Sequence, residues 1–189
     1  MRQYFFLFLF LATLAPAFGQ NKNYEEGLKA FDAEDYMKAF KLLKPFAESG
    51  NAMAEFVLGS CYLNPGLDLK NDSLAEHYLL SAAEKYHPES MGMLSLYYLQ
   101  KGSENEQLKI QALVWAEIAA AYKPAFSSTK ALIKHSLNQQ ELKEAEKILK
   151  EKKSRYDKID LGSFYKLNKR PALNNKILIK PLSRKINIT

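Results

Sequence analysis

The sequence predicts an all-α protein, a right-handed α-solenoid of about three helix pairs closed by a C-terminal capping helix. Three observations lead to this fold class: an internal repeat, a helical spacing of apolar residues within each unit, and an ordinary globular composition. The anchor residues Ala39, Ala75 and Ala112 lie 36 and 37 residues apart, and another alanine follows each anchor by eight residues. A period of this length with two helices per unit is typical of α-solenoids.

The helical assignment depends on apolar residues at positions 0, 3, 4, 7 and 8 from each anchor. These positions form one stripe on a helix of 3.6 residues per turn. In the three units the stripe consists of Ala39, Leu42, Leu43, Phe46 and Ala47; of Ala75, Tyr78, Leu79, Ala82 and Ala83; and of Ala112, Trp115, Ala116, Ala119 and Ala120. We expect the small residues to lie where two helices approach closely, with the large residues filling the space beside them.

The composition favours one folded domain and argues against nucleic-acid binding. The chain has 189 residues, of which 47% are apolar and 25% charged, with a formal net charge of +6. Residues 161–189 hold seven basic side chains and no acidic one, so the first 160 residues carry 20 basic and 21 acidic groups. A nucleic-acid-binding domain needs its basic footprint on the folded surface, and this excess lies beyond it.

The N-terminal residues 1–19 have the pattern of a secretory signal peptide. A positive start at Arg2 is followed by an apolar run from Tyr4 to Leu14 and by small residues suited to cleavage after Gly19 or Ala17. The alternative is a membrane anchor, but the run is shorter than the roughly 20 apolar residues that span a bilayer. Residues 20–34 follow as an N-terminal capping helix.

Residues 35–136 contain the repeats, and their helix boundaries are marked by capping and breaking residues. Asp35, Asn71 or Asp72, and Asn138 stand where helix N-caps are expected. The second helix of each unit is predicted to open near Ala52, Pro88 or Pro124, because proline suits the first turn of a helix. Asn64-Pro65-Gly66 and Gly102-Ser103 separate the units. Pro45 lies within a helical run and predicts a kink or a shortened turn.

The end of the chain divides into a capping helix and a basic tail. Residues 137–159 carry an apolar stripe of Leu142, Ala145, Ile148 and Leu149 opposite a side rich in Lys and Glu, as a terminal cap requires. Residues 160–189 alternate short apolar segments with basic residues. This tail is interpreted either as disordered or as a segment that docks on an acidic partner or an anionic membrane surface.

The repeats resemble the Sel1-like repeat, a relative of the tetratricopeptide repeat. Three segments carry the resemblance: Asp35-Tyr36-x-Lys38-Ala39, Ala47-Glu48-x-Gly50-Asn51-Ala52-x-Ala54, and Leu58-Gly59-x-x-Tyr62. The chain departs from the family pattern in a degraded loop at Pro65-Gly66-Leu67-Asp68, and in Tyr86 and Tyr122 where glycine is usual. The resemblance implies scaffolding or the binding of peptides and proteins, with no cofactor and no reaction.

The resemblance also implies that the first helices of the units line a concave groove. Positions 2, 5 and 9 from each anchor lie opposite the apolar stripe and are the predicted lining of this candidate groove. They are Lys41, Lys44, Glu48, His77, Leu80, Glu84, Val114, Glu117 and Ala121. The groove would run from basic to apolar, which suits a peptide with an acidic and an apolar end. The alternative is that these residues only face solvent.

Reactive chemistry is not indicated by the motifs. The chain has no Gly-rich phosphate loop and no Gly-x-Ser-x-Gly motif, and His77, His87 and His135 lack partners at metal-ligand spacing. Cys61 is interpreted as a small buried residue or, alternatively, as a thiol that pairs between chains. Trp115 is assigned to the core, although a sugar-stacking platform is the alternative.

These observations favour a non-enzymatic adaptor that binds a protein or peptide and is exported to a bacterial periplasm or secreted. The alternative is a hydrolase acting on the cell wall or on β-lactams, which requires a nucleophile with a base, or a metal site.

Overall fold

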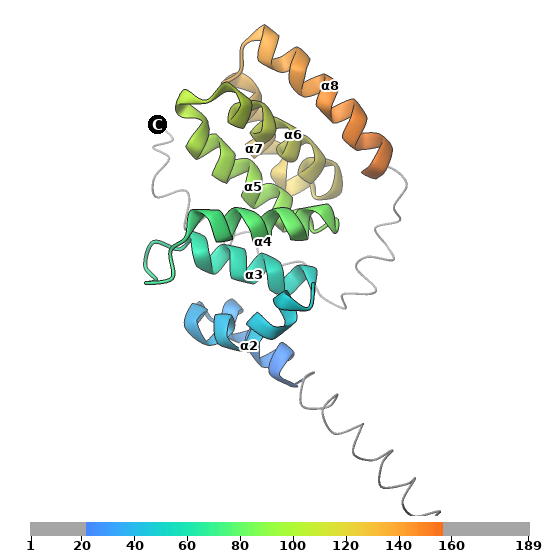
Figure 1. Ribbon diagram of the computed structural model, residues 1–189. Helices are drawn as coiled ribbons and strands as arrows, with labels where there is room; N and C mark the ends of the chain where they lie inside the picture. The colour runs from blue at the N-terminus through green and yellow to red at the C-terminus, as the bar shows by residue number, and fades with distance from the viewer. Residues whose placement is uncertain (1–21, 157–189) are drawn as a thin grey trace, which may run out of the picture.

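The computed structural model describes residues 22–156, with side chains to Lys152, and within this range every regular element is a helix (Figure 1). The first helix comprises residues 22–32. It is followed by α2 (Tyr36–Glu48), α3 (Ala52–Leu63), α4 (Asp72–Glu84), α5 (Pro88–Lys101), η1 (Gly102–Glu104), α6 (Glu106–Tyr122), η2 (Pro124–Phe126), α7 (Ser127–His135) and α8 (Gln139–Tyr156). The predicted signal peptide and the predicted basic tail lie outside the described residues.

Side-chain caps define the helix starts. The carboxylate of Asp35 and the amide oxygens of Asn51, Asn71 and Asn105 each accept a hydrogen bond from the backbone N–H three residues later. Asn138 caps α8, whose Glu141 carboxylate accepts in return from the Asn138 N–H at 2.7 Å. Such reciprocal bonds satisfy backbone donors that have no partner within the helix. The predicted caps Asp35 and Asn138 are confirmed, and Asn71 rather than Asp72 caps α4.

The predicted openings of the second helices are correct in two units of three. α3 begins at Ala52 and α5 begins at Pro88. In the third unit Pro124 begins the short η2 instead, and α7 starts three residues later at Ser127. α2 continues through the exposed Pro45 to Glu48.

The core repeats along the chain. The anchor alanines Ala39, Ala75 and Ala112 are fully buried, and each helix from α2 to α6 packs against the next. Figure 1 shows the helices stacked in chain order, from the N-terminal helix and α2 at one end to α6, α7 and α8 at the other. The stripe that the repeat predicts is therefore the surface that buries one helix against its neighbours.

One close contact recurs between units and shows that the fold is repeat-like. A Cβ atom added to Gly27 of the first helix would lie 2.7 Å from Cγ of Leu43 in α2, and one added to Gly59 of α3 would lie 2.7 Å from Cγ of Leu79 in α4. The first helix therefore packs on α2 as α3 packs on α4. Glycine is needed at both points because a side chain would overlap the leucine.

Candidate binding face

The outward side of α2 is exposed as the repeat predicts. Lys41, Lys44 and Glu48 are all exposed, and they lie one turn apart along the helix. The Lys44 ammonium is 3.8 Å from the Glu48 carboxylate, whereas Lys41 forms no ion pair with any described residue. The α2 side therefore presents a net positive charge to solvent.

The outward side of α4 is exposed as well and combines apolar with polar groups. His77, Leu80 and Glu84 lie on it, and 36% of Leu80 is accessible to solvent. The Glu84 carboxylate accepts a hydrogen bond from Lys152 of α8 at 3.2 Å. We call the six exposed residues of the two helices the α2–α4 face: Lys41, Lys44, Glu48, His77, Leu80 and Glu84.

The outward side of α6 is not open, which corrects the predicted groove. Val114 is fully buried, Glu117 is half-buried and bound to Lys130 at 3.7 Å, and only Ala121 is exposed. The physical reason is that α8 lies on α6 and covers the side that the repeat pattern assigns to solvent (Figure 1). The apolar end of the predicted groove is thus filled by the chain itself.

Apolar side chains pack α8 against α6, and charged side chains hold its two ends. Leu142, Ala145 and Leu149 line the junction with Leu113 and Val114 of α6. At the start of α8, the buried Glu141 binds Lys109 of α6; this contact lowers the pKa of Glu141, as does the backbone N–H of Asn138. Toward its end, the Lys152 ammonium lies 4.5 Å from the centre of the Trp115 ring. These contacts align α8 with α6 and bring it to the edge of α4.

A pocket of about 30 Å³ remains between α6, α7 and α8. That volume is close to the share of one water molecule in the liquid, whereas ligand pockets commonly measure 300–1,000 Å³. A site for an organic cofactor is therefore not formed at this position.

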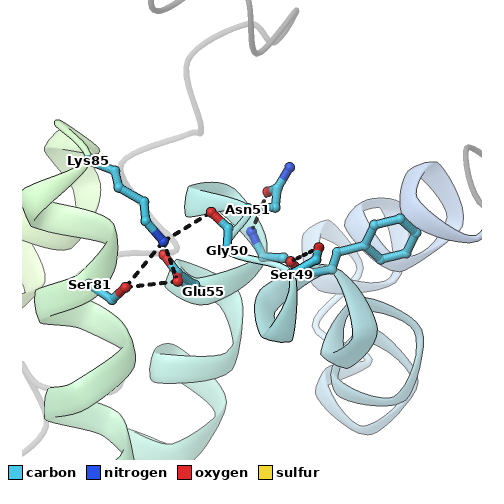
Figure 2. Close-up of polar contacts among 8 residues, drawn as sticks. Ser49, Gly50, Asn51, Glu55, Ser81 and Lys85 are labelled. Atoms are coloured by element: carbon cyan, nitrogen blue, oxygen red, sulfur yellow. Dashed lines mark hydrogen bonds and ion pairs between the residues drawn. The ribbon is translucent and has the colours of Figure 1, made fainter.

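A polar cluster joins the first two units at the turn between α2 and α3. Lys85, which caps the end of α4, donates to the Glu55 carboxylate at 2.6 Å, to the Gly50 carbonyl oxygen at 3.0 Å and to the Ser81 hydroxyl at 3.2 Å (Figure 2). Glu55 is 4% exposed, and its second oxygen meets no donor among the described residues. Loss of Lys85 would leave a buried carboxylate with only Ser81, so this cluster ties one unit to the next.

The next junction uses the same chemistry with a different glutamate. Lys123, which caps the end of α6, binds the buried Glu89 of α5 at 3.0 Å. Burial by itself would raise the pKa of Glu89, but its electrostatic interactions with His87 and Lys123 hold that pKa below its usual value. The buried His87 ring accepts from the Ser90 N–H as the N-cap of α5 and stacks on Phe56 of α3. These polar groups serve the junction between units.

Two turn residues at these junctions have left-handed backbone conformations. Gly50 has a φ of 87°, and Tyr86 has a φ of 68° at the equivalent place in the next unit. Glycine adopts this conformation without steric cost, whereas tyrosine does not. The second unit keeps the turn geometry at Tyr86 even though it has tyrosine where the first unit has Gly50.

The other residues singled out in the sequence lie in the core or apart from one another. Trp115 is 1% exposed, which agrees with its assignment to the core. The Cys61 thiol is buried, and burial raises its pKa to about 12, so it is neither placed nor ionised for chemistry at neutral pH. Among residues 22–152, no three His, Cys, Asp or Glu side chains gather as a metal site would require.

Sequence reasoning missed the buried carboxylates Glu55, Glu89 and Glu141. A glutamate in the first turn of a helix is a weak signal, because it also occurs at exposed helix starts. Their lysine partners are 30, 34 and 32 residues away in the chain. The available clue was that each glutamate and its lysine are separated by about one repeat length, because successive helices pack against each other along the stack.

No protein-family model, no curated protein and no solved structure matches this chain. Within the described residues, none of the helices has the length and apolar character of a membrane span.

Proposed function

We propose that this protein is a non-enzymatic adaptor that binds a protein or peptide through the α2–α4 face. The observation that carries this proposal is a difference between two helices at equivalent repeat positions: the outward side of α6 is covered, and the outward side of α4 is exposed. The outward side of α6 holds an amphipathic helix, whereas the equivalent side of α4 exposes Leu80. On α2, Lys41 is exposed and forms no ion pair with any described residue. Apolar groups flanked by unpaired charge favour association with a complementary partner.

The proposed architecture is a right-handed solenoid of about three Sel1-like helix pairs. The recurring glycine–leucine contact supports it, because Leu43 and Leu79 hold the same position after their anchor alanines. Each lysine–glutamate pair also joins one unit to the next, although the two pairs use different repeat positions. In such a solenoid the first helices of the units share one surface, which is the surface proposed to bind.

The binding proposal is tested by capture from an envelope fraction with tagged protein. We expect one partner in stoichiometric amount, and we expect Leu80→Asp or Lys41→Glu to reduce its recovery about ten-fold or more, as for central interface residues. Leu132→Asp is the matched control, because Leu132 is 40% exposed on α7, away from this face.

The competing hydrolase function is tested with the same preparation. Turnover of nitrocefin or of muropeptides by the pure protein, unaffected by Leu80→Asp, would contradict the adaptor proposal and favour the enzyme. An adaptor is expected to leave both substrates intact.

We also propose that the protein is exported to a bacterial periplasm or beyond. The support is the apolar run of residues 4–14, which suits the export machinery but is short for a membrane span. A reporter fused after Gln20 should be exported, and N-terminal sequencing should find a mature chain that begins at Gln20 or Phe18. An uncleaved chain in the membrane pellet would contradict this.

A further inference from the structure

The packing of α8 on α6 shows which kind of segment can bind to the outward side of a first helix in this fold. Leu142, Ala145 and Leu149 are spaced as i, i+3 and i+7, so a single side of one helix meets Leu113 and Val114. The remainder of α8 is rich in Lys and Glu. The occupant of the α6 position is therefore an amphipathic helix, held at its ends by the Glu141–Lys109 and Lys152–Glu84 ion pairs.

The same register of α4 has no occupant among the described residues. His77 and Leu80 occupy on α4 the positions that Val114 and Glu117 occupy on α6, two and five residues from the anchor alanine. Leu74, one turn before His77, is 39% exposed, and Leu80 is 36% exposed. Two large apolar side chains, six residues apart, are thus exposed on α4.

The charge of the adjoining α2 side restricts what can cover these leucines. Lys41 and Lys44 lie on that side, and only Lys44 has a carboxylate nearby. Glu84 is already engaged by Lys152. A ligand that spans both helices therefore meets an excess of positive charge on α2 and apolar surface on α4.

We propose that the α2–α4 face binds an amphipathic helix of a partner protein, with an apolar stripe on Leu80 and acidic residues toward Lys41 and Lys44. The bound helix would lie beside α8 and extend its layer toward the N-terminal end of the stack. This inference rests on the proposed function and specifies its partner. Protein surfaces that bind an amphipathic helix contact it through anchor residues spaced as i, i+3 or i+4, and i+7.

The chain's own tail is a poorer occupant than an acidic partner. Residues 161–189 carry seven basic and no acidic side chains, so the uncompensated Lys41 would repel them. The spacing of His77, Leu80 and Glu84 along one helix also favours a helical ligand, whose own side chains repeat each turn.

Fluorescence anisotropy with three synthetic peptides tests the inference on the full-length mature protein. The peptides have the length of α8, 18 residues. The first carries leucines at i, i+3 and i+7 on a Glu- and Ala-rich helix; the second replaces each Glu by Lys; the third keeps the composition of the first but scatters the leucines. We expect the first to bind about ten-fold tighter than either of the others, and to weaken with added salt.

Three variants locate the contact. Leu80→Asp should weaken binding of the first peptide about ten-fold or more. The double variant Lys41→Glu with Lys44→Glu should reverse the preference, so that the basic peptide binds better than the acidic one. Leu132→Asp on α7 is the control and should leave the affinity unchanged. Because all substituted residues are exposed, circular dichroism should show an unchanged helical fold.

The outcomes separate this inference from the function on which it rests. Equal affinity for the ordered and scattered peptides, or no effect of Leu80→Asp, would overturn the helical ligand even if a partner is captured through Lys41. Capture of a partner whose recovery is insensitive to Leu80→Asp and Lys41→Glu would overturn the binding face itself. Binding of the first peptide with the expected losses in both variants supports the inference.

Discussion

The outward sides of α4 and α6 occupy the same register but have different surroundings. His77 is exposed on α4, whereas Val114, at the same distance from its anchor alanine, is fully buried on α6. Both helices bury the stripe that the repeat predicts. The difference arises outside the repeat, because α8 covers α6 and ends its described contacts at Glu84 on the edge of α4.

This difference shows that position in a repeat determines which side of a helix joins the core, but not whether the other side stays open. A terminal helix can use the outward side of the last unit as its own binding site. The outward sides of α2 and α4 stay exposed, whereas the outward side of α6 packs against α8.

The largest expected effect comes from placing a charge at the two equivalent positions. Val114→Asp should cost about 3 kcal/mol or more, because it buries a carboxylate without a partner. His77→Asp should change stability by no more than about 0.5 kcal/mol, as expected for an exposed residue. Urea unfolding measures both variants.

Hydrogen exchange adds a local measurement to that comparison. In Val114→Asp the amides of α8 should lose protection before those of α4, because the helix can detach from its seat. Equal unfolding midpoints for the two variants would mean that α8 does not stabilise the fold through this position.

The next effect in size concerns the anchor at the start of α8. Glu141→Ala should destabilise by about 2 kcal/mol, since it removes a capping partner of Asn138 and the buried ion pair with Lys109. Glu144→Ala is the control, because Glu144 is a more exposed carboxylate of the same helix with only a weak pair to Lys147 at 3.8 Å. Thermal unfolding of both variants checks the prediction; equal losses would contradict it.

Lowering the pH should reduce the free energy of unfolding, and the buried carboxylates should contribute more to this loss than the exposed ones. The pKa values of Glu89 and Glu141 are lowered in the folded chain. Groups with depressed folded pKa values contribute stability above the unfolded value of about 4.3, and this contribution is lost as the pH falls through the folded value. Unfolding free energy should therefore be steady from neutral pH to about 5 and fall below about 4.

Isosteric variants assign this acid dependence to residues. Glu89→Gln and Glu141→Gln should each flatten the fall of stability at low pH, at a cost in stability near neutral pH. Glu84→Gln should leave the slope unchanged, because the Glu84 side chain is exposed to solvent. An unaltered slope in all three variants would assign the acid sensitivity to other carboxylates.

The smallest expected effect is at the end of α8 that borders the α2–α4 face. Lys152→Ala should cost about 1 kcal/mol or less, because it removes an exposed pair with Glu84 and a contact with the Trp115 ring. Chemical unfolding in low and high salt measures the charge-dependent part, which should shrink with salt. A loss as large as that of Val114→Asp would show that this end, and not the apolar seat, holds α8.

Local sequence signals predicted the helices, but they did not predict that α8 would cover the outward side of α6. Asp35 and Asn138 were predicted as caps because a short polar side chain satisfies a nearby backbone donor, which needs only neighbouring residues. Ala39, Ala75 and Ala112 were predicted as core because a period of 3.6 is visible in the chain. The error at Val114 had the opposite origin, since its covering helix begins 25 residues later at Gln139.

The sequence by itself determined the all-helical class, the register of the buried stripe, and most helix starts, because these depend on short-range spacing and capping. Only the tertiary structure decided that Glu55, Glu89 and Glu141 are buried with lysines from the neighbouring unit, and that α8 closes the α6 side while the α2–α4 face stays exposed. The physical reason is that ion pairs and helix docking join residues about one repeat or more apart, and their energies depend on the burial that the assembled fold creates.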